Sequence, residues 1–354
     1  MSKEGKIKYS GVGGEALIEG IMMKGPKGAA IACRMPDGTI DITRKEVHSV
    51  TDKCKLLKAP FIRGPISFVE QMIFGYKCMM ESAEKTAFDT SDTNEEEMSK
   101  LDKWLSDHFG PKMMAVIGGI AMVLGFGLAF LVFFYLPTFT SDLINKYLAH
   151  GTLDRYIPII EGLMRMIIFV LYMWGVSLMS DIKRVFKYHG AEHKSIFCVE
   201  HGLELTVENV RKQSRFHPRC GTSFIFITLI LSIIISSVIN VLFPELRATS
   251  LWLWIAVKVL MLPLIMSIGY ECIRLAGKHD NVFTRFLSAP GLLMQRITTK
   301  EPEDDIIEVG IAAIKAVIES DENEKAEDNV ETSAEETIEE SAEEEKTQDE
   351  SDEG

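Results

Sequence analysis

The sequence lacks three features that would assign it quickly to a common class. The first twenty residues contain no apolar run, so we expect no secretory signal peptide. The glycines at positions 11, 13 and 14 resemble a phosphate loop only loosely. No G-K-[ST] follows them, which favours a strand whose backbone is approached closely over a nucleotide site. The six cysteines show no regular spacing (Cys33, Cys54, Cys78, Cys198, Cys220 and Cys272).

The net charge of −13 hides an uneven distribution of charge. Residues 319–354 contain 18 acidic residues and two lysines, a net of −16, so the remaining chain carries about +3. The body of the protein is therefore slightly basic, and the acidic low-complexity tail from residue 320 is expected to be disordered. The charge pattern gives no direct signal of nucleic-acid binding.

Hydrophobic residues make up 47% of the chain and are concentrated in blocks. Four blocks of about 20 residues match the thickness of a bilayer core. They predict transmembrane helices at Met113–Tyr135, Ile157–Ser180, Thr222–Phe243 and Ser250–Tyr270. The expected class is an α-helical integral membrane protein with four transmembrane helices and a small β-rich cytoplasmic N-terminal domain.

The loops between these blocks alternate in basic content. Loop 136–156 carries Lys146 and Arg155, and loop 244–249 carries Arg247. Loop 181–221 carries eight basic residues. The positive-inside rule therefore predicts a multi-pass protein of the bacterial cytoplasmic membrane with both termini and loop 181–221 in the cytoplasm. All six cysteines then fall on the cytoplasmic side or its edge, where reduced thiols are expected.

The remaining chain divides by composition. Residues 1–10 are a loose N-terminus, and 11–60 form the β-rich domain. Within it 29–35 and 39–43 read as strands joined by the turn Pro36-Asp37-Gly38. The transmembrane domain is 113–270, followed by a cytoplasmic segment, 271–319. That segment ends in an amphipathic helix over 303–319, whose apolar stripe is Ile307, Ile311, Ile314 and Ile318. The tail is 320–354.

Residues 61–112 contain an interrupted apolar stretch and a polar linker. The stretch 61–80 is too short and too polar to span a bilayer. Two interpretations remain open for it: an amphipathic helix in the membrane interface, or a helix packed on the β-rich domain.

Three ionisable residues lie within the predicted spans. Glu161 and Arg165 are four apart on the second, and Lys258 is in the fourth. They indicate a structural polar clamp or, as the alternative, part of a transport path.

The strongest chemical signal is His189-Gly190-Ala191-Glu192-His193, an H-x-x-E-H pattern. On a helix, His189 and His193 share a face and can reach one cation. Glu192 lies over the same site and is the candidate catalytic base. Cys220 or His217, at the start of the third span, is the candidate third ligand.

The two clusters meet only if the helix bends or loop 181–221 folds back, and Gly190 is a plausible position for a bend. A divalent metal, zinc by its ligand types, fits this ligand set. Nearby Lys194 and Arg219 would suit an anionic substrate or a lipid phosphate. The alternative is a hydrogen-bonded polar lattice at the membrane surface without a metal.

Several separate motifs occur in order along residues 8–318 (residues 14–23, Arg63-Gly64, 189–194, 217–222, Tyr270-Glu271, Pro290-Gly291, 295–299 and Glu301-Pro302). Together they resemble the YqhQ-like family of bacterial membrane proteins. The resemblance implies a domain of unknown function and a predicted metal-dependent enzyme, without supplying a reaction. We therefore expect a hydrolase with a metal site at the cytoplasmic membrane face. The alternative is a non-enzymatic accessory factor for membrane-protein insertion, translocation or assembly, with the lipid bilayer and the biogenesis machinery as partners.

Overall fold

The computed structural model describes residues 10–87, 111–278 and 282–320, apart from residues 27, 48, 51–56, 58, 60 and 61. Residues 1–9 of the predicted loose N-terminus 1–10, residues 88–110, Cys54 and the acidic tail after residue 320 lie outside the described residues.

The N-terminal region is a four-stranded antiparallel sheet with the strand order β1-β2-β3-β4. Its strands are β1 (Gly13–Leu17), β2 (Gly20–Lys24), β3 (Gly28–Arg34) and β4 (Ile40–Glu46). The predicted turn between β3 and β4 is confirmed: Gly38 has a φ of +84°, and the Asp37 carboxylate accepts a 2.8 Å hydrogen bond from Thr39 N.

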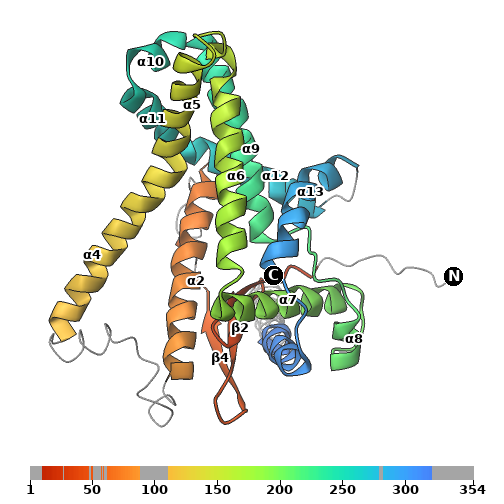
Figure 1. The fold of residues 1–354 in the computed structure, drawn as a ribbon. Coiled ribbons are helices and arrows are strands. Elements are labelled where there is room, and N and C mark those ends of the chain that lie inside the picture. Colours follow the sequence, from red (N-terminus) through yellow and green to blue (C-terminus); the bar gives the residue numbers. More distant parts are fainter. Residues whose placement is uncertain are drawn as a thin grey trace, which may run out of the picture.

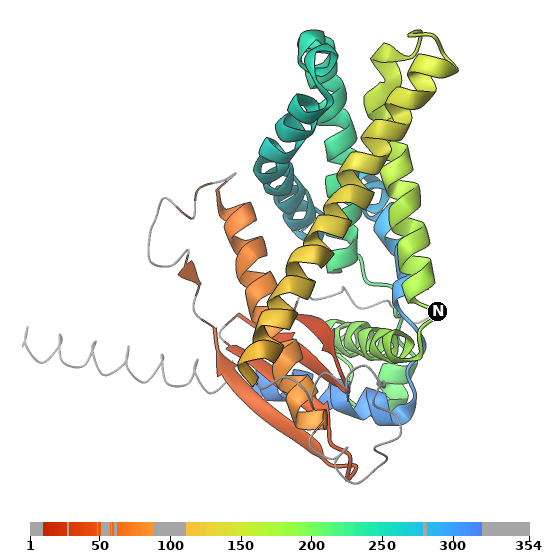
Figure 2. The same cartoon turned by 60° about the vertical axis from the view of Figure 1, so that its left-hand side comes forward.

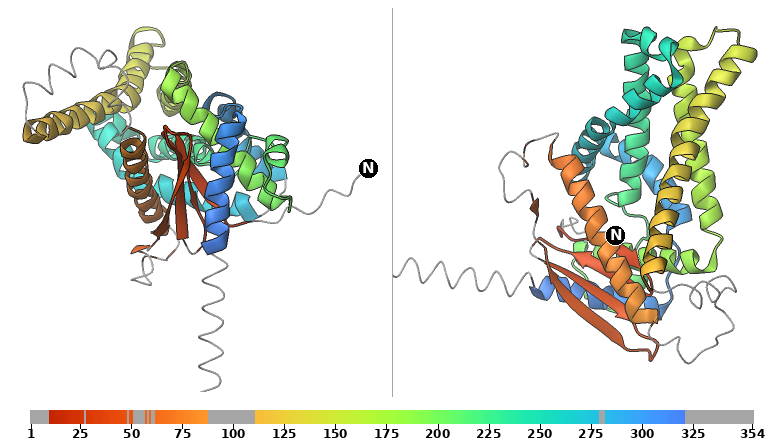
Figure 3. Two further views of the ribbon diagram at one scale, coloured as in Figure 1. Left: turned by 90° about the horizontal axis from the view of Figure 1, so that it is seen from below. Right: turned by 90° about the vertical axis from the view of Figure 1, so that its left-hand side faces the viewer.

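Both faces of this sheet are covered by helices (Figure 3). One face packs on α7 (Ser180–Glu200) and on the C-terminal helix over residues 304–320. The opposite face packs on α2 (Arg63–Ala87) through Phe74 and Cys78. Because helices cover both faces, β2 and β3 are nearly continuous apolar runs. Along most of edge strand β4, exposed and half-buried residues alternate.

Helix α2 joins the sheet to the apolar helices. Its C-terminal half packs on the sheet, as one of the two interpretations expected, and a position in the membrane interface stays a prediction. At its N-terminus, Arg63 makes a bidentate ion pair with Glu271 of α12, at 2.7 and 2.6 Å. A stripe of apolar side chains on α2 remains exposed: Val69, Met72, Ile73, Tyr76 and Met80.

Four helices are long and apolar enough to cross a membrane, as expected: Gly119–Tyr147, Asp154–Val176, Gly221–Leu242 and Leu251–Leu275. They rise from the end where the sheet and α7 lie, and the first leans away from the others (Figures 1 and 2). Their elements are α4 (Pro111–Phe130), a π-helical turn (Leu131–Tyr135), α5 (Leu136–Tyr147), a 3-10 turn (Asp154–Tyr156), α6 (Ile157–Val176), α9 (Gly221–Leu242), α11 (Leu251–Leu260) and α12 (Leu262–Lys278).

Two of these helices differ from the sequence expectation. The first continues through α5, so much of the expected loop 136–156 is helical, and buried Thr138 and Ser141 lie on this added segment. The fourth is interrupted at Met261, just before Pro263, whose ring nitrogen cannot donate a helical hydrogen bond. Two short helices, α8 (Val207–Arg211) and α10 (Pro244–Thr249), complete the connections.

Three of the ionisable residues within these helices form a buried cluster, here called the bundle clamp: Glu161, Arg165 and Lys258. Lys258 Nζ lies 2.8 Å from the Glu161 carboxylate and 2.6 Å from Thr138 Oγ1. Arg165 donates to Phe133 O at 2.8 Å and to Ser232 Oγ at 3.2 Å. These contacts link α5, α6, α9 and α11, as expected for a structural clamp.

A helix that the sequence did not predict, α13 (Val282–Thr298), returns along α9. The approach is close at Gly291, where a Cβ would lie 2.5 Å from Ser223 Cα. The predicted C-terminal helix is confirmed at residues 304–320, and its Ile307 and Ile314 are fully buried. Between these helices, residues 299–303 cross α7.

Candidate metal centre

Helix α7 is the platform of the site. It runs without interruption through Gly190, so the bend suggested for that position is absent. The chain turns instead at residues 177–179, where Met179 is extended with a ψ of 137°, and α7 then lies across the lower end of the apolar helices (Figure 1). Gly190 has a different role, because a Cβ there would collide with the carbonyl oxygen of Lys300. The backbone N–H of Lys300 in turn donates to Phe186 O at 2.8 Å, which holds this segment against α7.

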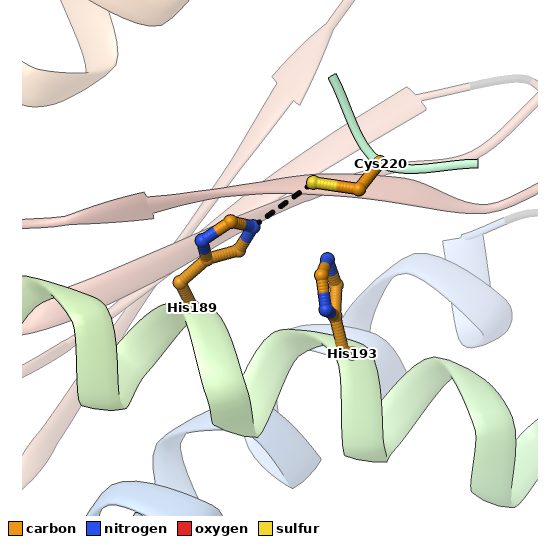
Figure 4. Close-up of side chains that lie close together, drawn as sticks. All are labelled: His189, His193 and Cys220. Atoms are coloured by element: carbon orange, nitrogen blue, oxygen red, sulfur yellow. Dashed lines mark hydrogen bonds between the residues drawn. The ribbon is translucent and has the colours of Figure 1, made fainter. Parts of the chain in front are cut away.

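Three candidate ligands converge above α7 (Figure 4). His189 and His193 are one turn apart on α7, and Cys220 is the N-cap residue of α9. His189 Nε2 lies 3.2 Å from Cys220 Sγ, and the three ligand atoms all lie within 4.8 Å of one another. The turn at 177–179 thus brings together residues that an unbroken α6–α7 helix would have kept apart.

The hydrogen bonds of the two imidazole rings orient their free nitrogens. His189 Nδ1 lies 2.9 Å from Thr298 O, and His193 Nδ1 lies 2.6 Å from Arg215 O. A backbone carbonyl only accepts, so each Nδ1 donates, and in the neutral ring each Nε2 keeps a lone pair. His193 is 1% exposed, and its Nε2 has no hydrogen-bond partner among the described residues. A buried acceptor of this kind is costly unless something binds it.

This donor set fits a divalent metal. Two imidazole nitrogens and a cysteine sulfur are common zinc ligands, and each histidine makes the carbonyl hydrogen bond typical of a ligand. A tetrahedral zinc separates its nitrogen and sulfur ligands by roughly 3.3–3.6 Å. The 3.2 Å separation of His189 Nε2 and Cys220 Sγ requires little adjustment to reach that value.

Glu192 lies beside the three ligands. Its Oε2 is 3.9 Å from His189 Nε2, and its side chain is 6% exposed. Burial raises the pKa of Glu192 to about 7, a shift that His189 opposes and Glu15 reinforces. A carboxyl with a pKa near neutrality can both accept and release a proton under physiological conditions.

Glu15, on β1, is a second carboxyl at this place and one that sequence reasoning did not identify. Burial raises its pKa, while a hydrogen bond from Gln71 and the charge of His189 lower it. Two glycines make room for the pair. A Cβ at Gly14 would lie 2.7 Å from Glu192 Cγ, and one at Gly75 would overlap the Glu15 carboxylate.

His217 lies next to the ligand group and not within it. Its ring centroid is 5.5 Å from that of His193, and its Nε2 faces Glu200 at 3.7 Å. Burial lowers its pKa to about 4. The Gln295 side chain accepts from His217 N at 2.7 Å and donates to His217 O at 2.8 Å. Of the two candidates for third ligand, the structure therefore brings Cys220 to the histidines.

The two basic residues expected to meet an anionic substrate, Lys194 and Arg219, are already paired with other groups of the chain. Lys194 is 3% exposed and donates to Arg211 O at 2.8 Å and Gln213 O at 2.9 Å, with the Glu301 carboxylate also at 2.9 Å. Arg219 pairs with Glu200. Both side chains stabilise loop 201–220 over α7.

The sequence reasoning missed the two carbonyls that orient the ligands and the second carboxyl beside Glu192. Thr298 O comes from unpredicted α13, Arg215 O from the loop before α9, and Glu15 from a strand. Backbone carbonyls carry no residue-type signal. Glu15 is far from the histidine motif in sequence, so no spacing rule connects them.

The comparisons with known proteins agree on one relationship. Residues 59–320 match the family model described as "Protein of unknown function (DUF1385)". The chain is 35% identical over 324 residues to "Uncharacterized protein YqhQ" of Bacillus subtilis (strain 168), covering 90% of this chain and 96% of the relative. No solved structure gave a significant match.

Proposed function

The chain belongs to the YqhQ-like family, and from that premise and the geometry of the site we propose that it is a metal-dependent membrane protein. His189, His193 and Cys220 hold a divalent cation, zinc by its ligand types. The reaction class that this arrangement supports best is hydrolysis at the membrane face.

The observation that carries the proposal is the unpartnered Nε2 of His193. Its lone pair is buried beside His189 Nε2 and Cys220 Sγ, and Thr298 O and Arg215 O fix both rings in this orientation. A polar lattice without a metal would be expected to provide a donor for this nitrogen. The described residues provide none.

A bound divalent cation supplies Lewis acidity and lowers the pKa of water. The chain's own residues do the rest. Glu192, held against β1 in a space that Gly14 leaves open, accepts a proton from the attacking nucleophile and returns it to the leaving group. Glu15 favours the protonated form of Glu192 and so helps it to retain that proton.

The four apolar helices cross a bilayer in this proposal, and α7, the sheet and the C-terminal helix lie at one membrane face. The alternating basic loops support a cytoplasmic position for that face in a bacterial cytoplasmic membrane. The position of Cys220 as the N-cap residue of the third apolar helix supports a candidate centre at the boundary between membrane and water.

One observation favours the second candidate function, an accessory factor for membrane-protein insertion, translocation or assembly. The apolar stripe on α2 includes Val69, Met72 and Tyr76, each more than half exposed. An apolar segment of a client protein can cover such a stripe.

Metal analysis of the detergent-purified protein tests the proposal, with bound partners identified from the same sample. The wild type and Glu192→Gln should contain stoichiometric metal, His193→Ala should lose it, and His217→Gln, the matched control, should retain it. Hydrolysis of a panel of ester, phosphoester and peptide substrates should be absent in Glu192→Gln alone among the metal-containing proteins. Full metal content in His193→Ala would remove His193 from the ligand set. A metal-free wild type that co-purifies with translocation or ribosomal components would favour the accessory factor.

A further inference from the structure

A second site lies at the same end of the apolar helices, in an open pocket of about 390 Å³. Its lining comes from the last turn of α6, the start of α7 and the end of α13: Trp174, Ser177, Leu178, Lys183, Arg296, Ile297 and Lys300. Three of these seven side chains are cationic and none is acidic. The pocket therefore concentrates positive charge beside an apolar wall.

The basic residues of the surrounding loop show that this charge is unusual. Of the eight between residues 181 and 221, seven pair with a carboxylate: Arg184, Lys187, Lys194, Arg211, Lys212, Arg215 and Arg219. The eighth is Lys183, which lines the pocket. Lys183, Arg296 and Lys300 make no ion pair or side-chain hydrogen bond within the ranges that the structure describes. These three cations without a carboxylate partner therefore face one shared space.

The apolar wall indicates which kind of anion would occupy it. Trp174 is 55% exposed and Leu178 66% exposed, and both lie where the second apolar helix ends. Tryptophan at the end of a membrane span lies at the level of the lipid headgroups. Basic side chains at that level attract anionic lipids, each contributing about 1 kcal/mol. A soluble phosphate would use the three cations and gain nothing from Trp174 or Leu178.

We infer that this pocket binds the phosphodiester headgroup of an anionic phospholipid, with Lys183, Arg296 and Lys300 around the phosphate and Trp174 and Leu178 against the start of the acyl chains. The site is separate from the candidate metal centre and needs no metal. The two share a segment of chain, because Ile297 and Lys300 flank Thr298, whose carbonyl accepts from His189. The lipid would therefore contact the segment that orients a candidate ligand, but His189 keeps its hydrogen bond to Thr298 O without it.

The test is native mass spectrometry of the full-length protein in detergent, titrated with dioleoyl phosphatidylglycerol or dioleoyl phosphatidylcholine. The wild type should retain one phosphatidylglycerol at concentrations where phosphatidylcholine is lost. Lys183→Gln/Arg296→Gln/Lys300→Gln should bind it roughly 100-fold more weakly, since each of the three cations contributes about a fivefold factor. The control Lys146→Gln/Arg155→Gln/Lys315→Gln removes the same charge at other exposed positions and should stay within about twofold of the wild type.

A second variant, Trp174→Ser, keeps all three cations and should weaken the lipid without changing its preference for the anionic headgroup. Equal binding by the wild type and the pocket variant would overturn the inference, as would equal retention of the two lipids. Displacement of the lipid by glycerol 3-phosphate at similar concentration would show a soluble phosphate site instead. Metal content should be unchanged in the pocket variant, so this test and that of the metal centre fail independently.

Discussion

Two buried polar clusters occupy different parts of this molecule, and their unpaired atoms differ. In the bundle clamp, Glu161 accepts from Lys258 and Trp254, and the buried atom without a partner within the described chain is Arg165 Nη2, a donor. At the candidate centre that atom is His193 Nε2, an acceptor. A cation can bind the lone pair of His193 Nε2, but it cannot bind the Arg165 donor. Burial of ionisable residues thus does not by itself indicate a metal site, whereas an unpaired acceptor among convergent candidate ligands supports the proposal of one.

The largest effect is expected from breaking the clamp. Lys258→Met leaves the Glu161 carboxylate buried, with Trp254 still donating to it, and should lower the free energy of unfolding by about 3–5 kcal/mol. Thermal or denaturant unfolding in detergent measures this loss. The double variant Glu161→Gln/Lys258→Met, which buries no charge at these positions, should recover much of the stability. A double variant as unstable as the single one would show that the ion pair is not the source of the effect.

A smaller effect is expected where residues 298–302 meet α7. Gly190→Ala places a methyl group against Lys300 O and should cost about 1–3 kcal/mol. Because this contact also positions Thr298 O, metal affinity should fall roughly 10- to 100-fold.

The matched control for Gly190→Ala is Gly175→Ala on α6, where a Cβ has no neighbour within 4 Å. Gly175→Ala should leave the free energy of unfolding unchanged. It should also leave the metal affinity, measured by competition with a chelator, unchanged. Equal effects at the two glycines would contradict the role given to the contact between Gly190 and Lys300.

The smallest effect is expected from Trp254→Phe, which keeps an aromatic ring and removes the N–H that donates to the two Glu161 carboxylate oxygens, at 3.2 and 3.4 Å. The free energy of unfolding should fall by about 1 kcal/mol, measured as for Lys258→Met. Metal content should not change. Loss of metal in this variant would couple the two clusters and weaken the distinction between them.

Local patterns in the sequence were sufficient for much of the fold. The paired strands around Pro36-Asp37-Gly38, the four apolar helices and the helix at 304–320 follow from turn chemistry, run length and helical periodicity. The face shared by His189 and His193 follows from their spacing of four on a helix. Each of these depends on residues close together in sequence.

The features that the sequence did not predict depend on contacts between residues that are far apart in the chain. Gly190 was interpreted as a helix-weakening residue, but its close neighbour is Lys300, 110 positions later. Helix α13 contains Pro290, which helical propensity disfavours, and packing on α9 stabilises it nonetheless. Glu15 reaches Glu192 because the sheet packs on α7. Periodicity carries no information about these pairings.

X-ray absorption at the zinc edge of the purified protein tests the central claim most directly. A site built by His189, His193 and Cys220 predicts one sulfur neighbour at about 2.3 Å and two imidazole nitrogens at about 2.0–2.1 Å, with oxygen completing the shell. Cys220→Ser should abolish the sulfur contribution, and His217→Gln should leave the spectrum unchanged. A wild-type spectrum without sulfur, or one that Cys220→Ser does not alter, would contradict the assignment of this site.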